Sequence, residues 1–223
     1  MLESPFSDNG FILYEDNHLF VLNKPCGLLT QPSGTDQDSL EAWGKQWIKE
    51  KYHKSGNVFL EAVHRLDKPA SGIVVFARTS KALSRLNTAM RNKSTLKNYL
   101  ALVEGYPGAQ EGLLEHNLVH DEHMARVGGA DERGAKLARL RYRVVRQSAD
   151  ATLLEIVLET GRYHQIRVQL AALGCPIAGD FKYGSRKRHH CEGCIALHHC
   201  RLQIPHPISG LPIIFEAPCN FSG

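Results

Sequence analysis

The sequence has few features of a membrane or secreted protein. No apolar run approaches the ~18 consecutive residues that indicate a membrane span. The N-terminal stretch MLESPFSDNG lacks the basic start and the apolar centre of a secretory signal. The six cysteines are irregularly spaced, and 223 residues bury enough apolar surface without a disulfide framework. We therefore expect a cytoplasmic protein with free thiols.

The sequence also lacks internal repeats, low-complexity tracts and a strong excess of one charge. Its 27 Lys and Arg residues face 23 Asp and Glu residues, which gives a formal net charge of +4. A balance this mild permits a nucleic-acid partner without requiring one. The apolar residues make up 43% of the chain, close to the globular average, and this excludes extended disorder.

The basic residues are unevenly distributed along the chain. They outnumber the acidic residues between positions 124 and 146. Within this stretch, apolar and basic residues alternate over 138–145, as in a strand with one buried face. The alternation predicts that Arg139, Arg141 and Arg143 share one exposed sheet face, which suits a polyphosphate partner. A solvated surface without a ligand is the alternative.

Periodicity and capping signals predict a mixture of strands and helices. Short apolar runs predict strands at 20–22, 73–77, 99–103, 138–145 and 153–158. Helical spacing predicts helices that begin after Ser39, after Thr79 or Ser80, and at about His164. These elements do not follow a regular βαβ alternation, so we expect an α+β protein.

Five short blocks contain the polar residues that stand out. They are Asn23-Lys24-Pro25, HRLDKPASG at 64–72, KNYLALVEG at 97–105, TGRYHQIR at 160–167 with its continuation to Gly184, and Leu197-His198 with His206-Pro207. Asp67 is predicted to lie on a turn that enters the following strand. A carboxylate there is a salt-bridge partner, a turn residue or a catalytic group. The helix start at 164–167 offers free N–H groups that suit a phosphate.

Taken in order, these blocks resemble the RluA-type pseudouridine synthases over about residues 15–215. The resemblance implies an α+β fold with a mixed, largely antiparallel central sheet, flanking helices and a central active-site cleft. It implies one catalytic domain over residues 1–223, without a separate N-terminal RNA-binding domain, a cofactor or a catalytic metal. The implied activity is that of an isomerase that converts specific uridines of ribosomal or transfer RNA into pseudouridine. A monomer is the default expectation.

The resemblance also implies roles for three residues in the implied cleft. Asp67 is the carboxylate that meets the positive charge developing at the anomeric carbon as the glycosidic bond breaks. It attacks the anomeric carbon, adds to the uracil ring or removes a ribose proton, and the sequence leaves these routes open. Arg167 is expected to pair with Asp67 and to lower its pKa. Tyr99 is expected to lie against the target base.

The implied RNA-binding residues form a larger set. The target uridine must leave its stack before it reacts, and Arg65 is expected to fill the vacated space. The other expected RNA-binding residues are His64, Arg162, His164, Gln165, Arg139, Arg141 and Arg143. The chain departs from the family pattern at Ala70, where a threonine is common.

Two rival interpretations remain open. The stretch 189–200 contains Cys191, Cys194 and Cys200 among histidines, and such a C-x-x-C pattern can bind zinc. Its next ligand candidates follow sooner than in a usual structural zinc site, so a loop without metal is preferred. The other rival is a non-catalytic RNA-binding module on the same fold, and the intact Asp67 argues against it.

Overall fold

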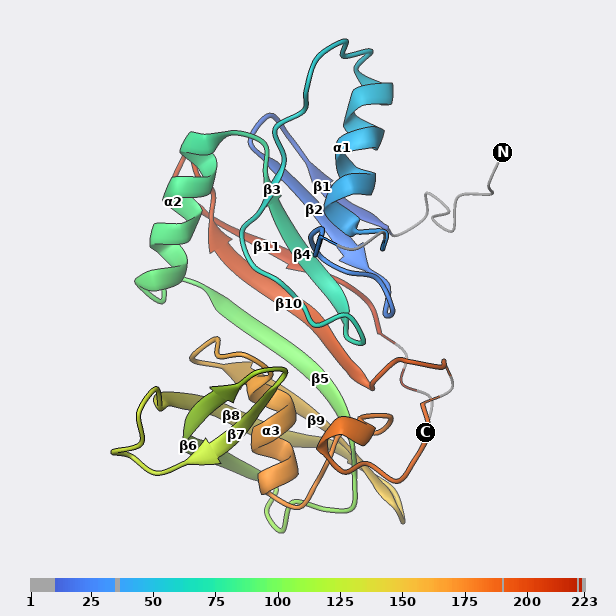
Figure 1. Cartoon of the computed structure of the whole chain (residues 1–223), viewed down its shortest axis with the longest axis vertical. Helices are drawn as coiled ribbons and strands as arrows, with labels where there is room; N and C mark the ends of the chain where they lie inside the picture. The colour runs from blue at the N-terminus through green and yellow to red at the C-terminus, as the bar shows by residue number, and fades with distance from the viewer. Residues whose placement is uncertain (1–10, 35–36, 190, 220, 222–223) are drawn as a thin grey trace. The chain divides into compact units, whose positions relative to one another are not determined.

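The structure is a computed structural model that describes residues 11–34, 37–189, 191–219 and 221 (Figure 1). Its contacts divide the chain into two compact units. The first unit comprises Met1–Thr95 and Cys200–Pro218, and the second comprises Leu96–His199 and Cys219–Gly223. One strand, β10 (Leu197–Pro205), begins in the second unit and continues into the first. The expected single catalytic domain stays a prediction.

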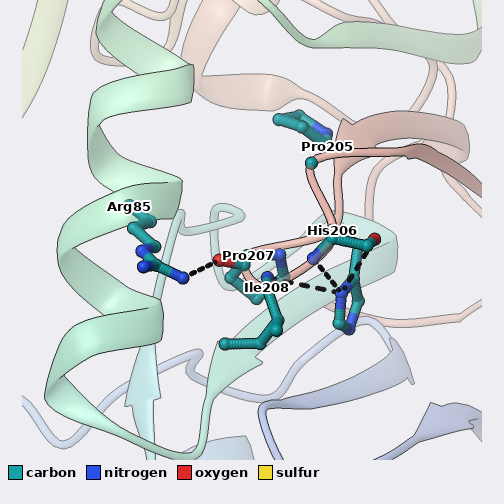
Figure 2. Close-up of a pocket in the computed structure, with 7 residues that line it drawn as sticks. Arg85, Pro205, His206, Pro207 and Ile208 are labelled. Atoms are coloured by element: carbon teal, nitrogen blue, oxygen red, sulfur yellow. Dashed lines mark hydrogen bonds between the residues drawn. The ribbon is translucent and has the colours of Figure 1, made fainter.

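The first unit is built on antiparallel strands. Strand β2 (Leu19–Lys24) pairs with β1 (Ile12–Glu15) on one side and with β4 (Ser71–Ala77) on the other. The short strand β3 (Glu61–Ala62) also pairs with β4. Strand β11 (Pro212–Glu216) forms a hairpin with β10, whose turn is drawn in Figure 2.

Two helices cover the strands of the first unit. Helix α1 (Leu40–Lys51) and helix α2 (Ser80–Arg91) begin at the caps Ser39 and Thr79, whose hydroxyls accept backbone N–H bonds. Trp47 of α1 stacks on Phe20 of β2, with ring centroids 5.0 Å apart.

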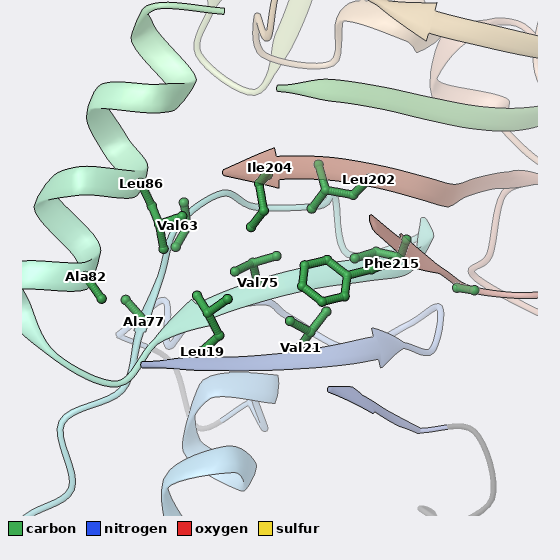
Figure 3. Close-up of a cluster of buried hydrophobic side chains, with 12 residues drawn as sticks. Leu19, Val21, Val63, Val75, Ala77, Ala82, Leu86, Leu202, Ile204 and Phe215 are labelled. Atoms are coloured by element: carbon green, nitrogen blue, oxygen red, sulfur yellow. The ribbon is translucent and has the colours of Figure 1, made fainter. Parts of the chain in front are cut away.

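The neighbouring residues of β2 belong to the core that α2 closes. Leu19 and Val21 pack with Ala82 and Leu86 of α2 in one buried cluster (Figure 3). Successive side chains of a strand point to opposite faces, so β2 is covered on both. This explains why β2 has an almost continuous apolar sequence rather than an alternating one.

The second unit is an antiparallel sheet with the strand order β5-β9-β8-β6-β7. Its strands are β5 (Leu96–Glu104), β6 (Glu111–Asp121), β7 (Met124–Gly128), β8 (Lys136–Gln147) and β9 (Ala151–Leu158). Helix α3 (Gln165–Ala172) packs Val168 against Leu118, Ala125 and Ala138 of three of these strands. A short 3₁₀ helix, Phe181–Tyr183, follows α3.

The predicted α+β class with a largely antiparallel sheet is confirmed. Each predicted strand lies within an observed one, and the three predicted helices are present. On β8, Ala138, Leu140 and Tyr142 are buried while Arg141 and Arg143 are exposed, as the alternation predicts. Strands β1, β3, β6, β7, β10 and β11 were not predicted.

Two further expectations concern membranes and thiols. Among the described residues, no helix combines the length and the apolar character needed to cross a membrane. The thiols of Cys175, Cys191 and Cys219 are free.

Candidate active site

Asp67 lies in the loop between β3 and β4, just before a turn at Lys68 and Pro69. Its carbonyl accepts a hydrogen bond from the Ala70 N–H at 3.0 Å, which closes this turn. The residue is half-buried. The predicted position of Asp67 on a turn that enters a strand is therefore confirmed.

A second loop, which follows β2, fixes the backbone on both sides of Asp67. The buried Thr30 hydroxyl donates to the Leu66 carbonyl at 3.0 Å and accepts from the Leu66 N–H at 3.1 Å. The Lys68 carbonyl accepts from the Gly27 N–H at 2.8 Å. Because both neighbours of Asp67 are bonded in this way, the backbone that carries this residue is fixed before any ligand binds.

Lys24, at the end of β2, supports the same loop from within the first unit. Its side chain is fully buried, and its Nζ donates to the carbonyls of Pro25 (3.0 Å), Leu28 (2.8 Å) and Lys68 (3.2 Å). Burial lowers the pKa of Lys24 to about 7, and the negative charge of Asp67 opposes that shift. The sequence showed Lys24 in a block without indicating this role.

In the second unit, Arg167 forms a buried ion pair with Asp180. Its Nε and Nη2 atoms donate to the two carboxylate oxygens at 2.7 and 2.8 Å, and both residues are almost completely buried. The guanidinium also lies 5.0 Å from the Tyr183 ring centroid. A bidentate pair of this kind fixes the plane of the guanidinium. The sequence did not identify Asp180 as a partner, and the expected pairing of Arg167 with Asp67 stays a prediction.

Tyr99 lies on β5 with only 6% of its surface exposed. Its ring stacks on the ring of His199, with centroids 4.4 Å apart and planes 13° from parallel. His199 is fully buried, and sequence reasoning missed it. The stack holds the Tyr99 ring in a fixed plane.

Gln165, an expected RNA ligand, uses its amide inside the protein. Its Oε1 accepts from the Thr160 hydroxyl at 2.8 Å and from the Arg162 N–H at 3.0 Å. Its Nε2 donates to the Arg139 carbonyl at 3.0 Å. The residue is buried, so we interpret Gln165 as a link between α3 and β8 and leave it out of the RNA-binding residues proposed below.

The other expected RNA ligands are more accessible. Arg65 and Arg162 are exposed, and His64 and His164 are half-buried. Nε2 of His64 accepts a hydrogen bond from the Val75 N–H at 3.3 Å, so this ring also fixes the loop that carries Asp67.

The three arginines of β8, which we call the β8 arginine strip, each pair with a glutamate. Arg141 pairs with Glu159 at 2.8 Å, Arg143 with Glu155 at 2.7 Å, and Arg139 with Glu115. All three pairs are at least partly exposed. Exposed pairs contribute only about 0–1 kcal/mol, so a phosphate can replace the glutamate at little cost.

Comparison with known proteins connects these residues to a family. A sequence model of the RNA pseudouridylate synthase family matches residues 18–172. The chain belongs to the RNA pseudouridylate synthase family. This synthase is 36% identical over 212 residues to the dual-specificity RNA pseudouridine synthase RluA of Escherichia coli (strain K12), covering 94% of this chain and 93% of the relative. It is also 36% identical over 218 residues to the ribosomal large subunit pseudouridine synthase D of Zymomonas mobilis, covering 92% and 68%.

Solved structures give the same fold for this synthase. The human RNA pseudouridylate synthase domain containing 4 superposes with a TM-score of 0.78 at 23% identity, over 94% of this chain and 88% of the other. The human RNA pseudouridylate synthase domain containing 1 gives 0.78 at 22% identity, over 98% and 87%. The fold follows from the structures, and the isomerase activity follows from the family and its curated relatives.

Within the described residues, two other regions lack the features of a reaction site: the stretch 189–200 and a hollow at the β10–β11 turn. Among the described residues, which omit His190, no group of three His, Cys, Asp or Glu side chains is placed to hold a metal ion. Figure 2 shows a hollow at the β10–β11 turn, where Arg85 donates to the Pro207 carbonyl at 2.6 Å. None of the expected site residues lines this hollow, so we do not place the reaction there.

Proposed function

We propose that this synthase converts uridines of ribosomal or transfer RNA into pseudouridine, with Asp67 as the catalytic carboxylate. The observation that carries the proposal is the rigid support of Asp67. The backbone on either side of this residue is bonded to Thr30, Gly27 and Lys24. Such support is what a carboxylate needs to meet a reacting carbon at a fixed position.

The chemistry explains why one carboxylate is sufficient. The bond from the anomeric carbon to the ring nitrogen breaks, and positive charge develops on the sugar. The uracil is retained and turned, and a bond forms from the anomeric carbon to carbon 5 of the ring. The proton at carbon 5 leaves, and the ring nitrogen freed from the sugar takes up a proton. Because substrate and product are isomers, no water is consumed and no second carboxylate is needed to position one.

Lys24 also acts on Asp67 through its charge. All three routes open to Asp67 require a carboxylate rather than a carboxylic acid. The charged ammonium of Lys24 interacts favourably with the negative charge of Asp67. We therefore assign Lys24 as a positioning residue, which acts through the loop and through its charge.

Residues of the second unit complete the proposal. Tyr99 is proposed to lie against the target base and Arg167 to supply a cation to the reaction, with Asp180 holding the plane of its guanidinium. Arg65, His64, Arg162, His164 and the β8 arginine strip are proposed to bind RNA. We further propose that the enzyme acts as a monomer in the cytoplasm.

Tritium release from RNA labelled at carbon 5 of uridine tests the proposal. The native protein should release tritium from ribosomal or transfer RNA transcripts. Asp67→Asn, which keeps the shape but removes the charge, should abolish release while RNA binding is retained. Asp131→Asn is the matched control, because Asp131 is an exposed loop residue, and it should behave as the native protein does. Release by the Asp67→Asn variant at the native rate would exclude Asp67 as the catalytic carboxylate.

A further inference from the structure

We propose that a column of aromatic rings in the second unit stacks an unpaired base of the RNA, next to the uridine that is modified. The column consists of His120, Tyr163, His164 and Tyr183. The proposal rests on the function proposed above, since it assumes an RNA substrate. It adds a base-binding subsite formed by residues outside the catalytic set.

The rings form a continuous series of contacts. The centroid of the Tyr163 ring lies 3.9 Å from that of His164, with planes 19° apart, and 4.2 Å from that of His120, with planes 44° apart. His164 meets the Tyr183 ring at 84°, with centroids 5.6 Å apart. Tyr183 in turn lies against the Arg167 guanidinium. The column therefore connects β6, the start of α3 and the 3₁₀ helix with a proposed catalytic residue.

The outer end of the column faces solvent. His120 is exposed, and 42% of the Tyr163 surface is exposed. In the part of the chain that the structure describes, Tyr163 is the only ring that contacts His120. One face of the terminal imidazole therefore has no aromatic neighbour within the described residues. A planar base added there would extend the column by one ring.

The backbone at His164 is strained in a way that aligns these rings. His164 has φ 51° and ψ 23°, in the left-handed region, where a residue other than glycine costs about 1 kcal/mol or more. Its Nδ1 lies 2.8 Å from the Tyr183 hydroxyl, which accepts from the Ala125 N–H at 2.9 Å. The Tyr163 hydroxyl reaches the His123 carbonyl at 3.4 Å. The rings are thus held in place before any ligand binds, which lowers the entropic cost of binding.

The charges around the column favour a base over a phosphate as the bound group. Arg162 and Lys182, both exposed, are the sequence neighbours of Tyr163 and Tyr183. The turn after β6 contributes the acidic residues Asp121 and Glu122. This mixed charge does not concentrate phosphate, whereas every base presents a face that stacks on an aromatic ring. We therefore expect the column to recognise unpaired RNA and to be indifferent to duplex RNA.

Fluorescence anisotropy with a labelled single-stranded RNA of about a dozen nucleotides, and with its duplex, tests this subsite. Tyr163→Ala and His120→Ala should each weaken single-strand binding about tenfold. Neither change should alter duplex binding or the slope of affinity against salt, because every group that meets a phosphate is retained. Tyr163→Phe keeps the ring and should bind normally. Tyr106→Ala is the matched control, since Tyr106 is 39% exposed on the same unit and outside the column.

The outcomes separate this inference from the proposed function. Equal losses for single-stranded and duplex RNA, or native binding by both alanine variants, would overturn it. If Tyr163→Ala fails to melt cooperatively, the exposed His120→Ala variant decides the question alone. Tritium release by the native protein reports the proposed function separately. Absence of release would remove that function while leaving the single-strand comparison intact.

Discussion

At the scale of single residues, Lys24 combines structural support with a sensitivity to protonation. A charged ammonium has three N–H donors, and the three carbonyls around Nζ accept all of them. A neutral amine has two and leaves one carbonyl without its bond. Burial lowers the pKa of Lys24 to about 7, so both forms are populated near neutral pH. The protonation of Lys24 therefore affects how firmly the Asp67 loop is held.

The pH dependence of stability tests this property of Lys24. Its pKa is about 7 in the folded state and 10.5 in an unperturbed lysine, so the unfolded chain binds more protons between these values. The free energy of unfolding should therefore rise as pH increases from about 7 towards 10. Denaturant titrations of the native protein and Lys24→Met across this range measure the effect. Burial also lowers the pKa of Lys97. The relevant quantity is therefore the difference between the free energies of unfolding of the two proteins.

That difference should increase with pH in favour of the native protein. Parallel curves for the two proteins would show that Lys24 titrates normally. Lys81→Met, at an exposed position of α2, is the control for the loss of a charge.

The sequence predicted individual residues better than their partners. Asp67 was predicted to lie on a turn because Pro69 and Gly72 mark a loop locally. Asp180 as the partner of Arg167, and His199 beneath Tyr99, depend on how separate segments pack, and no local pattern encodes such contacts. The burial of Gln165 was not predicted for the same reason, because it follows from the docking of α3 on β8, and its expected RNA-binding role stays a prediction.

At the scale of elements, the loop after β2 acts as a support for the loop that carries Asp67. Replacing Thr30 by valine keeps the shape and removes both hydrogen bonds to Leu66. Two buried backbone groups then lack a partner, which should cost about 1–3 kcal/mol of stability in urea denaturation. The rate of tritium release should fall together with the stability, because Asp67 is no longer fixed.

Thr88→Val is the control for this substitution, since Thr88 is an exposed position on α2. Native turnover by the Thr30→Val variant would show that the loop positions Asp67 without these hydrogen bonds.

Three of the strands that the sequence failed to predict, β6, β7 and β11, share a physical cause. Strand β7 is exposed at most positions, and β11 has Pro212 at its start and one buried residue. Strand β6 mixes charged and polar residues into its alternation. Pairing with a neighbour, rather than burial of a face, defines these strands, and a hydrophobic pattern does not report it. The predicted strands each have one or both faces in a core, and β10, which was not predicted, has buried residues as well.

At the scale of the whole molecule, the modest net charge of +4 includes a surface on which positive and negative side chains are paired. The β8 arginine strip and its three glutamates together carry no net charge. RNA must compete with the glutamates for these guanidinium groups. The glutamates therefore set how strongly the strip binds phosphate.

Neutralising the arginines of the strip and neutralising their glutamate partners should have opposite effects on RNA affinity. Replacing Arg139, Arg141 and Arg143 by glutamine should weaken RNA binding. The slope of log affinity against log salt concentration should also fall by about 2, because each phosphate of a single strand that the protein neutralises contributes ~0.7 to that slope. Replacing Glu115, Glu155 and Glu159 by glutamine should strengthen binding. Affinities at several salt concentrations check both. If the arginine variant bound RNA with unchanged affinity and slope, the strip would be a solvated surface.

The division of the chain has a consequence for its synthesis. Residues 96–199 are inserted between the two parts of the first unit, whose core includes Leu202, Ile204, Phe215 and Ala217 near the end of the chain. As the ribosome releases the chain from its N-terminus, β4 and α2 emerge long before β10 and β11 exist. The segment that carries Asp67 therefore lacks part of its core until β10 and β11 have left the ribosome. The core of the unit that begins first is completed only after residues 96–199 have been synthesised.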